Sequence, residues 1–121
     1  MTNNQDLQVI VSFLSKYTKP TAEEISFLGN IIESNDFKKK ETIHKQGEIQ
    51  KYMGFITKGA VRFYYLEDNG KETTFEFAFE GTPIGEYMSL ISQAPSVASA
   101  EAIDQTTIVA IYKDHFLDFI N

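Results

Sequence analysis

Residues 60–79 read AVRFYYLEDNGKETTFEFAF, and this stretch decides the fold. Two runs rich in aromatic and β-forming residues, Ala60 to Leu66 and Glu72 to Phe79, flank Glu67-Asp68-Asn69-Gly70. An Asn-Gly pair between such runs is the strongest short-range hairpin signal, because a tight primed turn needs residues that accept a positive φ. The stretch therefore predicts two antiparallel strands. Strict alternation would place Thr73, Phe75, Phe77 and Phe79 on one face and Thr74, Glu76 and Ala78 on the other.

The aromatic side chains of this hairpin are expected mainly in the core, and any that point outward could form a partner surface. They are Phe63, Tyr65, Phe75, Phe77 and Phe79. Arg62 is the only arginine of the chain. Its place among aromatic residues favours a salt bridge, or stacking on Tyr64 or Phe75, over ligand capture.

Short β-rich runs separated by turns lie on both sides of the hairpin. They are Glu41 to His44, Lys51 to Thr57, Ser96 to Ile103 and Thr106 to Ile111. Gly81 to Gly85 is expected to be a loop, and Glu86 to Ser92 to make one or two helical turns. Six or more short strands with regular turns are typical of a barrel or a sandwich.

Helical patterns occur at the two ends of the chain. Leu7, Ile10, Val11 and Leu14 recur at the spacing of one buried helical face, and Thr21 with Glu24 forms a capping-box pattern. That second helix is expected to end at Asn35-Asp36, and a short helix to close the chain from Lys113. The predicted fold is mainly β: an antiparallel β-roll (a double-stranded β-helix, jelly-roll-like) over residues 37–121, after an N-terminal helical segment over residues 1–36.

Composition narrows the class of protein. The chain has 121 residues, 42% of them hydrophobic and 23% charged, which fits one globular domain. It has no cysteine, no apolar run long enough to span a bilayer and no signal pattern after Met1, so we expect a cytoplasmic protein without membrane contact. The net charge of −6 makes it a poor DNA binder by itself, because phosphate neutralisation needs clustered cations.

From Phe37 to Asn121 the chain resembles the cyclic nucleotide-binding domain of the Crp/Fnr (catabolite activator) regulators. The resemblance rests on the order and spacing of glycines around one hairpin. Its carriers are Lys39 to Ile43, Gly47-Glu48, Phe55 to Arg62, Asn69-Gly70, Gly81 to Glu86, Pro95 to Ala98 and Tyr112 to Asp114. It implies an effector-sensing domain of a bacterial transcription regulator, which would reach DNA only through a helix-turn-helix domain beyond Asn121. The full-length regulator would be a homodimer, and this chain a truncated form or a stand-alone module.

The resemblance also implies a phosphate-binding cassette, whose candidate ligand-binding residues here are Ile84, Gly85, Glu86, Ser96, Val97 and Ala98. In the family a glutamate holds the ribose and an arginine holds the phosphate. Glu86 matches the glutamate, although an acidic residue also simply suits a helix start. Ser96 falls at the place of the arginine, and no Lys or Arg occurs between Lys71 and Lys113.

Losing such a charge-assisted contact costs about 2–5 kcal/mol, so tight binding of cyclic AMP is not expected. A weaker ligand, another small anionic effector that Ser96 or Ser99 could help bind, and no ligand at all stay open. No other cofactor is implied.

Two alternatives come from other classes: a ligand-free protein-interaction module on the same fold, and a cupin-like small-molecule-binding protein. His44 and His115 stand 71 positions apart, which is a poor start for a metal site, so none is expected. The sequence has no cysteine, no Gly-x-Ser-x-Gly elbow and no residue set that suggests a triad. It therefore predicts no catalytic residue and no enzyme.

Overall fold

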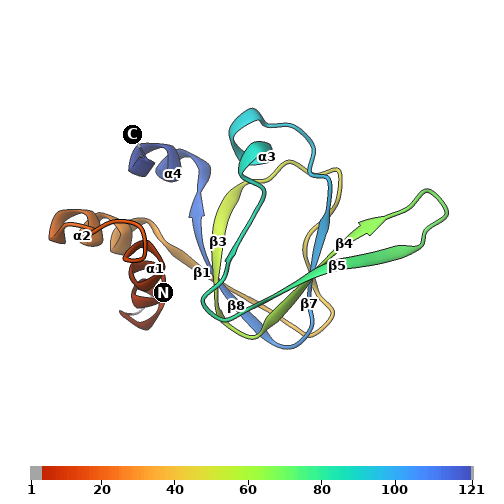
Figure 1. Cartoon of the computed structure of the whole chain (residues 1–121), viewed down its shortest axis with the longest axis horizontal. Helices are drawn as coiled ribbons and strands as arrows, with labels where there is room; N and C mark the ends of the chain where they lie inside the picture. Colours follow the sequence, from red (N-terminus) through yellow and green to blue (C-terminus); the bar gives the residue numbers. More distant parts are fainter. Residues whose placement is uncertain (1–3, 121) are drawn as a thin grey trace.

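The computed structural model describes residues 4–120, so residues 1–3 and residue 121 lie outside the description. Two four-stranded antiparallel sheets, ordered β1-β8-β3-β6 and β2-β7-β4-β5, form the predicted β-roll (Figure 1). The strands are β1 Glu33–Phe37, β2 Thr42–His44, β3 Tyr52–Lys58, β4 Ala60–Leu66, β5 Glu72–Phe79, β6 Pro83–Ile84, β7 Ser99–Ala102 and β8 Thr106–Tyr112. The helices are α1 Asn4–Leu14, α2 Ala22–Ile31, α3 Tyr87–Ser92 and α4 Lys113–Ile120.

The N-terminal helices cover the outer face of the first sheet. Thr21 caps α2 with both hydrogen bonds of the predicted capping box: Glu24 N donates to Thr21 Oγ1, and Thr21 N donates to Glu24 Oε1. The apolar faces of both helices pack on β3 and β8 in one buried cluster, made of Ile10, Leu28, Ile31, Ile32, Phe55, Val109 and Ile111.

The predicted end of the second helix is wrong. The helix stops at Ile31, Ile32 is extended, and Glu33–Phe37 forms β1, so the sheet begins before residue 37. The reason is non-local: β1 pairs along its whole length with β8, from Glu33 opposite Ala110 to Phe37 opposite Thr106. Such pairing outweighs local preference.

The hairpin of β4 and β5 has the predicted bounds and projects from the roll (Figure 1). Its turn differs from the predicted primed turn. Gly70 N donates to Glu67 O at 2.8 Å, and Gly70, at φ +87°, is the residue of positive φ, whereas Asn69 is not. This is the longer hairpin connection, a turn followed by a glycine in the left-handed region.

A β-bulge in β5 overturns the predicted sharing of faces. Phe63 pairs with Glu76 and Tyr64 with Thr74, so Phe75 is the extra residue. Beyond the bulge the pattern shifts by one position, and Phe77 and Phe79 point outward with 54% and 60% of their surface exposed. Core packing is therefore the wrong expectation for these two side chains.

Arg62 has the expected structural role. Its guanidinium donates to Glu101 at 2.9 Å, to Glu72 at 2.5 Å and to Thr74 at 2.9 Å. It also lies 4.2 Å from the centre of the Tyr64 ring. The salt bridge and the stacking are both confirmed.

No helix within residues 4–120 combines the length and the apolar character needed to cross a membrane.

Candidate ligand-binding site

A cavity of about 350 Å³ lies inside the roll and is lined from both sheets and the start of α3. The roll interior elsewhere is filled by a second buried cluster that includes Ile56, Val61, Ala78 and Ile108. Five of the six predicted ligand-binding residues line the cavity: Ile84, Gly85, Glu86, Val97 and Ala98. The sixth, Ser96, is buried and outside the lining, in contact with Glu86.

Glu86 joins the two segments of the predicted cassette. Its carboxylate accepts hydrogen bonds from Val97 N at 3.1 Å and Ala98 N at 3.3 Å, and a further one from the Ser96 hydroxyl. Ser96 Oγ also lies 2.8 Å from Ala98 O. The Glu86 carboxylate thus accepts hydrogen bonds from three donors of the second segment: the Ser96 hydroxyl and the N–H groups of Val97 and Ala98. It makes no side-chain cap to α3, but Glu86 is the residue directly before that helix, so its charge also suits the helix start.

The backbone around Glu86 is fixed by its neighbours. Gly85 has φ +133°, and a Cβ there would lie 2.9 Å from Met53 Sδ and 3.2 Å from Tyr52 O. Only glycine fits this position. The buried Gln50 accepts from Glu86 N at 3.5 Å and donates to Tyr52 O at 2.9 Å. Glu86 is therefore held in place by β3, by β6 and by the segment with Gln50 that directly precedes β3.

Aromatic rings form one wall of the cavity. Tyr65 and Phe75 stack with their ring centres 4.3 Å apart, and Phe63 lies 6.4 Å from Phe75. The bulge turns Phe75 toward the cavity, where Glu76 lies as well. Tyr52, on the other sheet, packs edge-on against Tyr112, and burial raises the pKa of Tyr52 to about 12.

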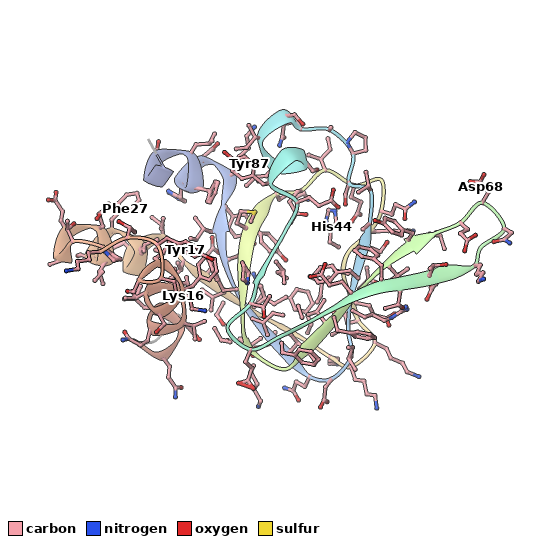
Figure 2. All side chains as sticks on the ribbon, in the orientation of Figure 1. Lys16, Tyr17, Phe27, His44, Asp68 and Tyr87 are labelled. Carbon is pink, nitrogen blue, oxygen red and sulfur yellow. The ribbon has the colours of Figure 1, made fainter. Side chains whose placement is uncertain are left out.

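His44 lies between the two sheets on the side of α3 (Figure 2) and lines the cavity. Within the described residues, its Nε2 is a buried atom without a hydrogen-bond partner. Burial lowers the pKa of His44, and this outweighs the raising effect of Glu48 and Glu86. The imidazole is therefore neutral near pH 7.

The charges at the cavity are of one sign. Glu76 and Glu86 are the charged side chains of its lining among the described residues, and neither Lys nor Arg contributes. Arg62 is held on the outer face of β4 by Glu72 and Glu101. No described group of three or more His, Asp or Glu side chains is arranged to hold a metal ion.

Comparison with known proteins agrees with this geometry. Residues 34–121 match the model of the family described as the cyclic nucleotide-binding domain, which is more than half of the chain. The chain belongs to the cyclic nucleotide-binding domain family. This membership favours the resemblance found in the sequence over the cupin-like alternative.

A relative and a solved structure, both from Thermus thermophilus, are similar to this domain. The cyclic AMP receptor protein is 26% identical over 98 residues, which cover 81% of this chain and 45% of the relative. The crystal structure of catabolite activator protein, at 25% identity, matches with a TM-score of 0.73 over 83% of this chain and 46% of that chain. The domain spans a little less than half of the length of these relatives.

More distant structures share the fold. The sensor domain of the transcriptional regulator DNR from Pseudomonas aeruginosa is 19% identical, with a TM-score of 0.80, and the match covers 93% of this chain and 75% of that one. The regulatory subunit of a cAMP-independent protein kinase A from Trypanosoma brucei is 22% identical, with a TM-score of 0.80 over 96% and 41% of the two chains.

Several cavity residues of this cyclic nucleotide-binding domain were not predicted from sequence. They are His44, Gln50, Tyr52, Phe63, Tyr65, Phe75 and Glu76. The sequence predicts core or surface positions for the aromatic residues of the hairpin, but alternation within one strand does not reveal the bulge that turns Phe75 and Glu76 to the same side. His44 and Tyr52 reach the cavity through the pairing of distant strands, and no local signal reveals this.

Proposed function

We propose that this domain is the effector-sensing domain of a Crp/Fnr-type bacterial transcription regulator and acts by binding rather than by catalysis. The observation that carries the proposal is the cavity inside the roll, lined by the two cassette segments around Glu86 and Val97. The similarity to a cyclic AMP receptor protein and to the sensor domain of a transcriptional regulator supports it. DNA binding and dimerisation would belong to the whole regulator, and an effector would act by favouring one of its two states.

We further propose that cyclic AMP is not a tight ligand of this domain. Ser96 takes the place where the family has its phosphate-binding arginine, and the donors beside it already serve the Glu86 carboxylate. A cyclic phosphate would have to displace that carboxylate without a cation to replace the arginine. The missing contact corresponds to roughly 30-fold to several-thousand-fold in affinity.

A related case is the Trypanosoma brucei regulatory subunit, which belongs to a cAMP-independent kinase. Its structure with cAMP in the A site is that of a mutant in which a Glu, a Thr and a Val are replaced by Ala, Arg and Ala. That mutant thus carries an added arginine and has cAMP in its A site.

Isothermal calorimetry with cyclic AMP and cyclic GMP, with a thermal-shift control, tests both proposals. We expect no binding by the wild-type domain at micromolar nucleotide, and binding by Ser96→Arg. A ligand at 100 times its Kd adds about 2.7 kcal/mol to the free energy of unfolding, which a thermal shift detects. Gln105→Arg, in the exposed turn between β7 and β8, adds the same charge away from the cavity and should not bind. Micromolar binding by the wild type would contradict the exclusion of cyclic AMP.

Exposed aromatic side chains favour one second candidate, the protein-interaction module. Phe77 and Phe79 lie side by side with Arg62 and Ala60 on the outward hairpin face and are more than half exposed. In that case no small ligand would stabilise the domain, and sedimentation velocity would show association that the double variant Phe77→Ser/Phe79→Ser abolishes.

A further inference from the structure

Glu76 is a carboxylate without a partner at the aromatic side of the cavity. Within the described residues it makes no hydrogen bond and no ion pair, whereas the neighbouring carboxylate of β5, Glu72, is bound to Arg62. The bulge at Phe75 places both Phe75 and Glu76 on the cavity side. A free negative charge therefore lies beside a stacked aromatic pair, Tyr65 and Phe75.

Within the described residues, the rest of the cavity lining supplies no positive charge to an anion, although the Ser99 hydroxyl is part of it. Glu86 uses the N–H groups of Val97 and Ala98, and its own charge adds to that of Glu76. His44 is neutral, and its buried Nε2 can exchange a single hydrogen bond with a ligand but supplies no charge. Arg62 lies on the opposite face of β4 and is held by two glutamates.

An aromatic wall combined with an acidic group is the usual arrangement for an organic cation. The ring faces attract a cation through their quadrupole, and they also stack on a flat apolar body. A volume of about 350 Å³ is at the lower end of small-molecule sites, so the ligand is small.

We propose that the effector of this domain is a small aromatic amine in its protonated form, with its ring against Phe75 and Tyr65 and its ammonium group directed to Glu76. The inference rests on the proposed function, because it names the ligand class of the same cavity. It differs from the expectation of a small anionic effector, which the charges of the lining disfavour.

Three probes with the same ring and different charge test the ligand class: 2-phenylethylamine, 2-phenylethanol and 3-phenylpropionate. Affinities are measured by calorimetry and by NMR titration of the wild-type chain. We expect the amine to bind at least about tenfold more tightly than the alcohol, and the carboxylate to bind least. Glu76→Gln should reduce the difference between amine and alcohol to about twofold or less, and Glu76→Lys should make the carboxylate the better ligand.

Glu80→Gln is the matched control, since it removes the same charge from an exposed residue outside the cavity lining and should keep the preference for the amine. Because Glu76 has no partner, its variants should fold, and melting curves confirm that. Equal affinity of amine and alcohol, or an unchanged preference in Glu76→Gln, overturns the proposal.

Absence of binding by all three probes also overturns the ligand class. That result alone does not contradict the proposed sensor function. The sensor function is contradicted if, in addition, Ser96→Arg does not bind cyclic AMP. Binding of cyclic AMP by that variant, with no binding of the ring probes by the wild type, would preserve the ligand-binding function and exclude the aromatic amine.

Discussion

The carboxylate of Glu86 accepts a hydrogen bond from the backbone N–H of Val97 at 3.1 Å. These residues belong to two different segments, one at the start of α3 and the other on the approach to β7. The contact therefore links the two cassette segments to each other. The Ala98 N–H and the Ser96 hydroxyl donate to the same carboxylate. Since Ser96 is buried, the donor that it supplies has no access to bulk water.

Glu86→Ala should destabilise the domain by about 1–3 kcal/mol, because it removes the acceptor of the Val97 and Ala98 N–H groups, and Ala98 is buried. Glu86→Gln keeps one acceptor oxygen and should lose less. Urea denaturation followed by circular dichroism measures both, with Glu80→Ala as the control for removing an exposed carboxylate. A loss in Glu86→Ala no larger than in the control would show that these hydrogen bonds do not stabilise the fold.

His44 should make the stability depend on pH. Burial lowers its pKa below 6.5, so the unfolded chain binds a proton more readily than the folded one. The contribution of His44 is fully present above pH 6.5 and is lost as the pH falls toward the lowered pKa. Urea denaturation from about pH 5 to 7.5 should therefore show a weaker pH dependence in His44→Gln than in the wild type.

If His44→Gln keeps the wild-type slope of the unfolding free energy against pH, burial of His44 does not favour its neutral form.

Local signals in the sequence predicted local structure correctly. The capping box of Thr21 and Glu24 and the bounds of both hairpin strands depend on residues a few positions apart, and the structure has all of them. The prediction that Arg62 forms a salt bridge succeeded for a similar reason, since Glu72 and Thr74 lie across the same hairpin.

The errors concern contacts between distant residues. The strand Glu33–Phe37 exists because β8 pairs with it, some 70 positions later in the chain. The bulge at Phe75 is a matter of register between two strands, and alternation within one strand cannot show it. The resemblance located the cassette segments in the sequence. Only the side-chain geometry shows that the Glu86 carboxylate accepts the hydrogen bonds of the Val97 and Ala98 N–H groups.

Arg62 should contribute to stability through its two carboxylate partners. It is partly exposed, so solvent weakens each pair, and a double-mutant cycle of Arg62→Met with Glu101→Gln should give a coupling of about 0.5–1.5 kcal/mol. The coupling should decrease in 1 M salt, because screening acts on a pair that water reaches. A cycle of Arg62→Met with Glu76→Gln is the control and should give no coupling. A coupling near zero with Glu101 would mean that this pair adds nothing to the fold.

Gly85→Ala should destabilise the domain more than Gly81→Ala, which lies in the same loop. Both glycines have a positive φ, +133° and +86°, so alanine is strained at either position. At Gly81 a Cβ meets nothing within 4 Å, and we expect a loss of about 1–2 kcal/mol from the backbone conformation alone. At Gly85 the new Cβ would also press on Met53 Sδ and on the Tyr52 carbonyl, and the latter belongs to a paired strand that cannot move freely.

The difference in unfolding free energy between Gly85→Ala and Gly81→Ala measures the effect of the close contacts at Gly85. Urea denaturation should show Gly85→Ala losing at least about 1 kcal/mol more than Gly81→Ala. A Met53→Ala background removes the contact with the sulfur. In that background, adding Gly85→Ala should lower the free energy of unfolding by less than it does in the wild type. The loss that remains would come from the Tyr52 carbonyl and from the backbone conformation. Equal losses in Gly85→Ala and Gly81→Ala would mean that β3 yields to the added methyl group, and the rigid placement of Glu86 by this loop would then be wrong.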